Sequence, residues 1–274
     1  MGDSIMAHAA MQQVLRNRPE WTTSYQQAAN LEVSLIMRPQ LHCRSLLDLP
    51  ACNMAPLIHF GINTILFDDK RRMHPINHFL ELCGMAQDET PQPEYSPVYM
   101  WQPHQGEFAP ERPIPSYDFI IAPFSNATRM DEPRMLEFSH YPYLFAQLGR
   151  MYTGPAARCR IAVIGGHDSP MPWGNPLRES KHWAFDHSEV YYEYGRPLSE
   201  VLGMMRACRG AIITVDSGAN RLAHLAGVDN HIILSPDFYP AEWVGHPGAY
   251  QIRGNPDTWT NSKILNTVEE VIHR

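Results

Sequence analysis

The sequence predicts an α/β protein made of two doubly wound, Rossmann-like domains of parallel strands that face each other across a cleft. Strands of the buried type alternate with amphipathic helices, which is typical of βαβ units. This alternation occurs in two separate runs, and residues 87–116, which hold seven prolines, lie between them. A chain of 274 residues is long enough for two such domains. We place them at residues 1–112 and 113–274.

The first run of the pattern predicts a small N-terminal domain. Apolar residues recur at helical spacing before Pro19, and two short apolar runs follow with a helical pattern between them. A proline suited to a first helical turn opens one more helix. In order, the expected elements are helix 3–18, strand 33–39, helix His42–Leu49, strand 62–69 and helix 74–85.

The second run predicts a fuller domain of four strands and four helices. The apolar runs 117–124, 160–166, 211–215 and 231–235 are expected to form buried strands. The helices are expected after Pro142, after Pro197, over 220–226 and over 262–274. The last of these carries an apolar stripe through Ile264, Leu265 and Val268, which we expect to pack back on the N-terminal domain.

Composition and charge exclude several classes of protein. Hydrophobic residues make up 44% and charged residues 19% of the chain, which is ordinary for a globular protein. The net charge is −7 with no basic cluster, which disfavours nucleic acid as a partner. The five cysteines form no CxxC pair, which disfavours a disulfide framework or a thiolate zinc site. With no apolar run of ~18 residues and no signal peptide, we expect a cytoplasmic protein without a membrane span.

The sharpest local motif follows the apolar run 211–215. Asp216, Ser217 and Gly218 come directly after this strand and open a helix. Ligands bind at the carboxyl ends of parallel strands, where a helix N-terminus offers free N–H groups to a phosphate. The pattern therefore predicts a diphosphate cradle, with the alternative that Asp216 or Ser217 only caps the helix and Gly218 only makes a turn. The expected donor-binding residues here are Asp216, Ser217, Gly218, Ala219, Asn220 and Arg221.

The surrounding residues resemble the donor-binding half of glycosyltransferase family 9, the heptosyltransferase family. The matching positions are Gly195, Leu198 to Glu200, Ala211 to Val215, Asp216 to Gly218, Leu222, Ala223, Pro236 and Trp243. Near the N-terminus, Gly2 and Asp3 resemble the Gly-Asp motif that opens the family's first helix. Residues 117–129 and 160–166 are similar to the first two strands of its second domain. The resemblance implies a GT-B fold with a reduced N-terminal domain.

The resemblance also implies a reaction. It is the inverting transfer of a sugar from a nucleotide-diphosphate sugar, ADP-heptose or another, to a hydroxyl acceptor on the N-terminal side. Asp3 is the implied general base, with capping of the first helix as the alternative. Arg129 and Arg221 could bind the diphosphate in a forked manner. The further implied donor-binding residues are Ser125, Asn126, Thr128, Arg129, Gly165 and Gly166.

Departures from the family pattern leave other functions open. Arg221 stands where the family often has a histidine, and the hydrophobic strand that usually precedes Gly-Asp has no counterpart before Gly2 and Asp3. A catalytically reduced protein that binds a nucleotide sugar, or an assembly subunit, is therefore an alternative. Transfer to a modified nucleobase in DNA is another. The chain has no Asp-x-Asp pair, since Asp68 and Asp69 are adjacent, so we expect neither a metal nor another cofactor.

Overall fold

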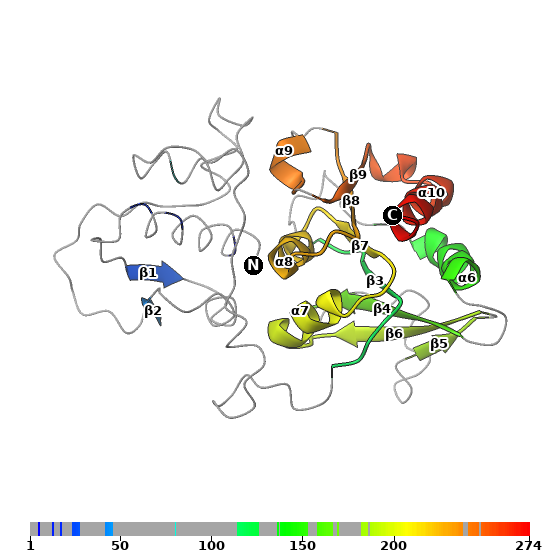
Figure 1. Cartoon of the computed structure of the whole chain (residues 1–274), viewed down its shortest axis with the longest axis horizontal. Helices are drawn as coiled ribbons and strands as arrows, with labels where there is room; N and C mark the ends of the chain where they lie inside the picture. The colour runs from blue at the N-terminus through cyan, green and yellow to red at the C-terminus, as the bar shows by residue number, and fades with distance from the viewer. Residues whose placement is uncertain are drawn as a thin grey trace. The chain divides into compact units, whose positions relative to one another are not determined.

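The structure is a computed structural model of the whole chain, which divides into two compact units, Met1–Glu111 and Arg112–Arg274 (Figure 1). The described residues are 5, 13, 17, 24–27, 42–45, 80, 114–125, 136, 138–152, 158–166, 169, 182–185, 187–237, 241–246 and 248–274.

The described part of the first unit contains a pair of parallel strands, β1 (Ser24–Gln27) and β2 (His42–Ser45). The helix expected over His42–Leu49 is therefore wrong for its first four residues. Pairing with β1 gives these residues their backbone hydrogen bonds, and helix propensity is too weak to oppose such pairing. Ile5 and Leu80 are buried and have helical backbone, as expected for helices 3–18 and 74–85, whereas strands 33–39 and 62–69 lie outside the described residues.

The second unit contains a seven-stranded sheet with the order β5-β6-β4-β3-β7-β8-β9. Six strands run parallel, and β5 pairs with β6 in the antiparallel direction at one edge. The strands are β3 (Phe119–Ala122), β4 (Cys159–Gly165), β5 (His182–Ala184), β6 (Ser188–Tyr194), β7 (Ile212–Val215), β8 (His231–Ser235) and β9 (Tyr250–Arg253). The predicted fold class, α/β with a doubly wound parallel sheet, is confirmed.

The order of the strands defines a switch point in the sheet. The chain starts at the central strand β3 and adds β4 and then β6 on one side. It then returns to the other side of β3 and adds β7, β8 and β9. This is the doubly wound arrangement of dinucleotide-binding proteins, in which ligands bind where the carboxyl ends of the two central strands diverge. In this unit that place is the end of β3 and of β7.

Helices cover both faces of the sheet (Figure 1). One face is covered by α6 (Tyr141–Tyr152) and α10 (Asn261–Ile272), which follow the short 3-10 helices η2 (Phe138–His140) and η3 (Pro256–Thr258). The other face is covered by α7 (Leu198–Arg206) and α8 (Gly218–Ala226), and α9 (Ala241–Val244) lies near α8. The result is a three-layer α/β/α unit.

The apolar stripe of α10 is buried within the second unit. Ile264 and Val268 are fully buried and Leu265 is partly buried against the same cluster, which includes residues of α6, β8 and β9. This packing follows from the helical spacing of the stripe. The expected contact of α10 with the N-terminal domain stays a prediction.

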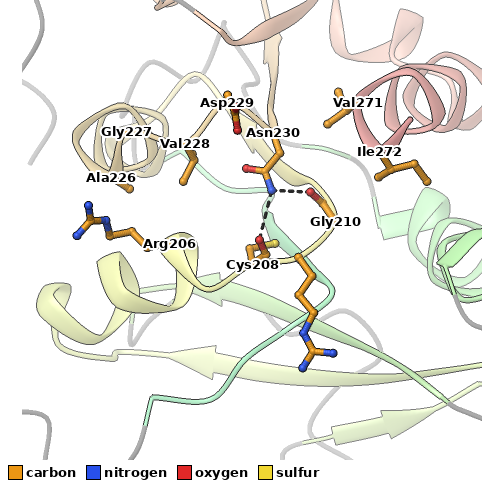
Figure 2. Close-up of a pocket in the computed structure, with 11 residues that line it drawn as sticks. Arg206, Cys208, Gly210, Ala226, Gly227, Val228, Asp229, Asn230, Val271 and Ile272 are labelled. Atoms are coloured by element: carbon orange, nitrogen blue, oxygen red, sulfur yellow. Dashed lines mark hydrogen bonds between the residues drawn. The ribbon is translucent and has the colours of Figure 1, made fainter. Parts of the chain in front are cut away.

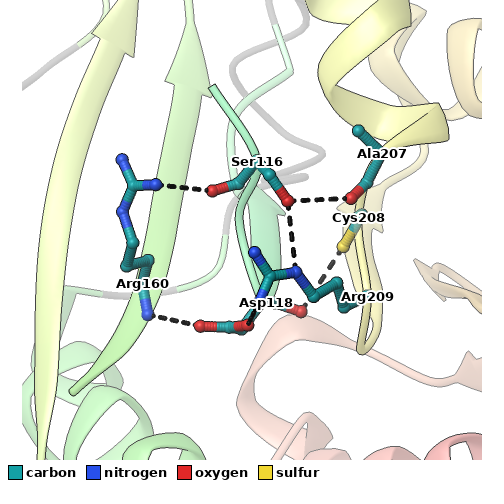
Figure 3. A network of polar contacts seen from close by, with 6 residues as sticks. All are labelled: Ser116, Asp118, Arg160, Ala207, Cys208 and Arg209. Carbon is teal, nitrogen blue, oxygen red and sulfur yellow. Dashed lines mark hydrogen bonds and ion pairs between the residues drawn. The ribbon is translucent and has the colours of Figure 1, made fainter. Parts of the chain in front are cut away.

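The segment before β3 is fixed to the sheet by a polar network (Figure 3). Arg160 donates from Nη1 to the carbonyl oxygen of Ser116 at 2.9 Å and from its backbone N–H to Asp118 Oδ2 at 2.8 Å. Arg209 lies 3.6 Å from Asp118 Oδ1 and donates from Nε to Ser116 Oγ at 3.3 Å. The chain therefore enters this unit along a defined path.

Candidate functional site

The carboxyl end of β7 leads directly into α8. Ser217 is the N-cap of this helix, and its Oγ accepts a hydrogen bond from the Ala219 N–H at 3.2 Å. The backbone N–H of Asp216 donates to the Leu234 carbonyl at 3.1 Å, which fixes the turn to β8. Asp216, Ser217, Gly218 and Ala219 are all partly exposed. Ser217 therefore caps the helix. Because these residues are partly exposed, the first turn of α8 is accessible to a ligand.

The other predicted donor-binding residues that are described lie at the same edge of the sheet. Ser125 follows β3, and because Ala122 is opposite Thr214 the chain leaves β3 beside the end of β7. Gly165 ends β4, the next strand, and Gly166 follows it. The structure thus brings Ser125, Gly165 and Gly166 to the carboxyl edge that also holds the start of α8.

The glycines at this edge of the sheet differ in whether their surroundings require a residue without a side chain. A Cβ on Gly165 would lie 2.5 Å from Ser169 Oγ, so close packing already requires glycine there. A Cβ on Gly166 would meet nothing closer than 3.9 Å, and Gly166 is exposed. Gly218 is not among the glycines with positive φ, so it does not need glycine's conformational freedom. The turn explanation for Gly218 therefore fails, while close approach of a ligand remains a prediction.

Two side chains from the first turn of α8 point to α9 instead of to solvent. Asn220 is fully buried and donates from Nδ2 to the Val244 carbonyl at 3.1 Å. Arg221 is 5% exposed and donates from Nη1 to the same carbonyl at 3.3 Å. These bonds satisfy the carbonyl at the end of α9 and tie it to the start of α8. These hydrogen bonds explain why the side chains of Asn220 and Arg221 are buried. The predicted contact of the two residues with the diphosphate stays a prediction.

A cluster of histidines lies beneath α8, between the helix and the sheet. His231 is fully buried; its Nε2 shares a hydrogen bond of 2.8 Å with Thr214 Oγ1 and its Nδ1 one of 2.7 Å with His246 Nε2. His246 also stacks on His224 with 4.4 Å between ring centroids and 6° between planes. We call His224, His231 and His246 the histidine cluster.

The histidine cluster is electrostatically constrained. Burial lowers the pKa of His231 well below its usual value, and the nearby His246 and Arg221 lower this pKa further. His231 is therefore neutral at pH 7. No local pattern in the sequence marks these histidines, because they are separated along the chain and have no motif spacing.

A second polar group lies where β6 ends. Arg196 donates from Nε to Glu193 Oε2 at 2.6 Å and from Nη1 to Glu200 Oε2 at 3.0 Å, while the Tyr117 hydroxyl donates to Glu193 Oε1. Burial and this last bond raise the pKa of Tyr117. Gly195, with φ of 63°, makes the turn that places Arg196 between the two carboxylates. The spacing of Arg196 and Glu200, four residues apart at a helix start, is the signal that could have found this group.

Several predicted site residues lie outside the described residues. These are Asp3, the implied base, and Asn126, Thr128 and Arg129 of the loop after β3. Their roles stay predictions.

A pocket of about 430 Å³ lies at the opposite, amino-terminal edge of the sheet (Figure 2). Its wall includes Gly210 before β7, Asn230 before β8 and Gly227 at the end of α8. The Nδ2 of Asn230 donates hydrogen bonds to the carbonyl oxygens of Cys208 and Gly210, at 3.4 and 2.5 Å. The C-terminal ends of helices favour cations over anions. We therefore do not place a diphosphate in this pocket.

Of metal-binding groups, free thiols and helices able to span a membrane, the described residues contain only free thiols. Among them, no group of three or more histidine, cysteine, aspartate or glutamate side chains is arranged to hold a metal ion. Cys159 and Cys208 are free thiols, and burial raises the pKa of Cys208 to about 12. No helix in this part of the chain combines the length and the apolar character that crossing a bilayer requires. The expectation that the chain needs no metal stays a prediction.

Comparison with known proteins supports the fold. No protein-family model and no curated protein sequence matches the chain. Three solved structures resemble it over nearly their full length. A family 9 glycosyl transferase from Veillonella parvula is 11% identical, with 100% of this chain and 94% of that chain covered and a TM-score of 0.64. The ADP-heptose LPS heptosyltransferase II of E. coli is 14% identical, with coverage of 99% and 96% and a TM-score of 0.66.

The third structure is the E. coli heptosyltransferase WaaC, solved with ADP, which is 13% identical, with coverage of 99% and 97% and a TM-score of 0.61. At such low identity the likeness establishes the fold. It agrees with the fold expected from the resemblance in sequence. The chain thus has the GT-B fold of the heptosyltransferase-like family 9 glycosyltransferases.

Proposed function

We propose that the chain is an inverting glycosyltransferase that transfers a sugar from a nucleotide-diphosphate sugar to a hydroxyl acceptor. The observation that carries the proposal is the β7–α8 turn at the switch point of the sheet, where Ser217 caps an exposed helix start. A helix N-terminus at this place suits a diphosphate. The same fold serves a heptosyltransferase of E. coli that was solved with ADP.

The donor would lie across the ends of β3, β4 and β7. Backbone N–H groups of the first turn of α8 would face the diphosphate, and Gly166 would leave room beside it. Arg221 is buried and bonded to the Val244 carbonyl, so its contribution would be positive charge from beneath the site rather than a forked contact. The departing diphosphate would be stabilised by this charge and the helix dipole without a metal.

The acceptor would be activated by Asp3. Inversion requires a base that takes the proton of the acceptor hydroxyl while that oxygen attacks the anomeric carbon and the diphosphate leaves. The resemblance in sequence supports this role for Asp3. ADP-heptose is the first donor to try, because a neighbour in structure is named for ADP-heptose.

The donor site can be tested by calorimetric binding of ADP-, UDP- and GDP-sugars to the wild-type chain. At least one should bind, and Gly218→Val should abolish its binding while the circular dichroism spectrum and melting temperature stay nearly unchanged. The matched control is Arg206→Gln at the opposite edge of the sheet, which should bind like the wild type. Unchanged affinity in Gly218→Val, or loss of binding in Arg206→Gln, would contradict the assignment of the donor site.

Catalysis can be separated from binding at Asp3. Asp3→Asn should lower turnover by ~10²–10⁴-fold, the usual contribution of a general base, while donor affinity stays nearly constant. Normal turnover in this variant would mean that Asp3 only caps a helix, since Asn caps about as well as Asp. Turnover should also continue in the presence of EDTA, because the proposed reaction needs no metal ion. Saturable donor binding with no product from any acceptor would support the alternative of a nucleotide-sugar-binding protein.

A further inference from the structure

The histidine cluster lies between α8 and the sheet, where α8 ends and β8 begins, and the proposed reaction does not use it. His224 is on α8 itself, six residues after Gly218, which is about 9 Å along a helix that rises 1.5 Å per residue. Arg221 lies between the two positions along α8 and acts electrostatically on His231. A charge at the start of α8 therefore acts on the cluster electrostatically over about this distance, with the Arg221 guanidinium between them.

We propose that the histidine cluster takes up a proton when a diphosphate binds at the N-terminus of α8, so that donor binding and protonation of the cluster are coupled. This inference rests on the proposed function. The bound species is the dianionic diphosphate of a nucleotide sugar, and the proton comes from solvent.

The hydrogen bonds of the cluster can accommodate the added proton. In the neutral cluster, one proton lies between His231 Nδ1 and His246 Nε2, and the His231–Thr214 bond holds another. If His246 becomes an imidazolium, its Nε2–H donates to His231 Nδ1. If His231 becomes one, it donates to both Thr214 and His246. Neither protonation breaks a hydrogen bond, so the proton belongs to the cluster rather than to one ring.

The charges around the histidine cluster determine when the cluster binds the added proton. The groups around His231 are Thr214 from β7, Arg221 from α8 and His246 from the segment after α9, and His224 of α8 stacks on His246. Without a ligand, burial and the Arg221 cation keep His231 neutral. The position of His224 in the last turn of α8 favours a positive charge there. A dianion at the other end of the helix would offset the Arg221 charge, and the balance would move toward protonation.

The coupling must be reciprocal. If the ligand favours the protonated cluster, then low pH favours the ligand. A shift of about one unit in the cluster's apparent pKa corresponds to about a tenfold change in donor affinity. The affinity should therefore rise as the pH falls from 7.5, by up to about tenfold once the pH is below the apparent pKa of the cluster.

The test is titration calorimetry with whichever of ADP-heptose and ADP-, UDP- or GDP-glucose binds, since the diphosphate diester of a nucleotide sugar does not titrate near neutral pH. Near pH 6, the binding enthalpy should depend on the ionisation enthalpy of the buffer, with uptake of a fraction of a proton up to about one. His246→Gln and His224→Gln each remove one imidazole ring of the cluster while keeping a polar side chain. Both should reduce the proton uptake and flatten the pH dependence of affinity, whereas the matched control His273→Gln, at the exposed end of α10, should leave both unchanged.

The outcomes are distinguishable. If neither ADP-heptose nor any of these glucose donors binds at any pH, the proposed function and this inference both fail. If one binds with buffer-independent enthalpy and constant affinity, the coupling is refuted and the donor site stands. Should a glutamine variant fail to fold, the ring signals of the wild-type histidines are followed by NMR against pH, with and without the ligand. Superimposable titration curves would then overturn the coupling.

Discussion

The two faces of the central sheet differ in what they bury. The face toward α6 and α10 holds a cluster of apolar side chains, including Phe145, Trp259 and Val268, which are all fully buried. The face toward α7 and α8 buries polar and charged groups. They include His231, Arg221 and Glu193, each held by hydrogen bonds or ion pairs.

The difference separates the face that stabilises the unit from the face that borders the proposed donor site. Burying a polar group is unfavourable unless it finds partners, and a buried charge requires a counter-charge or hydrogen bonds. The α6–α10 face buries mainly apolar and aromatic side chains and serves as the foundation of the unit. On the α7–α8 face, Glu193 and Arg221 are buried near the turns that begin these two helices, which is the edge where we place the donor.

Truncating the apolar face should give the largest effect on stability. Phe145 is fully buried and lies 5.6 Å from the Tyr141 ring and 5.7 Å from the Phe185 ring, so Phe145→Ala should lower the free energy of unfolding by about 3–5 kcal/mol. Urea unfolding measures this change. Tyr143→Ala, on the exposed side of α6 at 54% exposure, should change it by less than about 0.5 kcal/mol. A comparable loss in the two variants would mean that the face is not a packed foundation.

The same difference explains how much of the fold the sequence could predict. The strands β3, β4, β7 and β8 are continuous apolar runs, and each was predicted near its observed place. The strand β6 was missed because its sequence mixes two glutamates with tyrosines. Its Glu193 is buried only because Arg196 and Tyr117 meet it, and such partners are not visible in a local pattern. The edge strands β5 and β9 are short and were missed as well.

The candidate site was predictable to the extent that it depends on local sequence. The run from β7 through Asp216 and Ser217 into α8 is contiguous, so its geometry could be anticipated. The histidine cluster could not, because His224, His231 and His246 meet only through the packing of α8 on the sheet. The burial of Arg221 was missed for the same reason, since the Val244 carbonyl that holds it lies 23 residues away.

The polar face should make the unit sensitive to acid. The pKa of His231 is lowered in the folded state, so between that value and its unfolded value of about 6.5 the unfolded chain binds more protons. The free energy of unfolding should therefore fall as the pH falls below about 6.5, by up to about 1.4 kcal/mol per pH unit for one proton. Urea unfolding at a series of pH values without ligand measures the slope.

A variant isolates the contribution of His231 to this slope. His231→Leu leaves Thr214 and His246 without their bonds, which should cost about 1–3 kcal/mol near pH 7.5. Its stability should then fall less steeply toward pH 5, so the wild-type and variant curves approach each other. Phe145→Ala, in contrast, should shift the whole curve without changing its slope. Parallel curves for His231→Leu and the wild type would show that His231 is not the titrating group.

The smallest expected effect on stability tests whether Ser217 acts only as a helix cap or also contacts the ligand. Its Oγ accepts from the Ala219 N–H at 3.2 Å, so Ser217→Ala should lower the free energy of unfolding by about 1 kcal/mol. Ser217→Thr keeps a capping hydroxyl and should recover most of this loss. The Ala219 N–H that the hydroxyl occupies cannot also serve a diphosphate, so releasing it in Ser217→Ala adds a free donor at the helix start. Nucleotide-sugar affinity, measured by calorimetry, should then be retained in Ser217→Ala despite the lower stability. If affinity is instead lost in Ser217→Ala and regained in Ser217→Thr, the hydroxyl contacts the ligand directly and the cap is secondary.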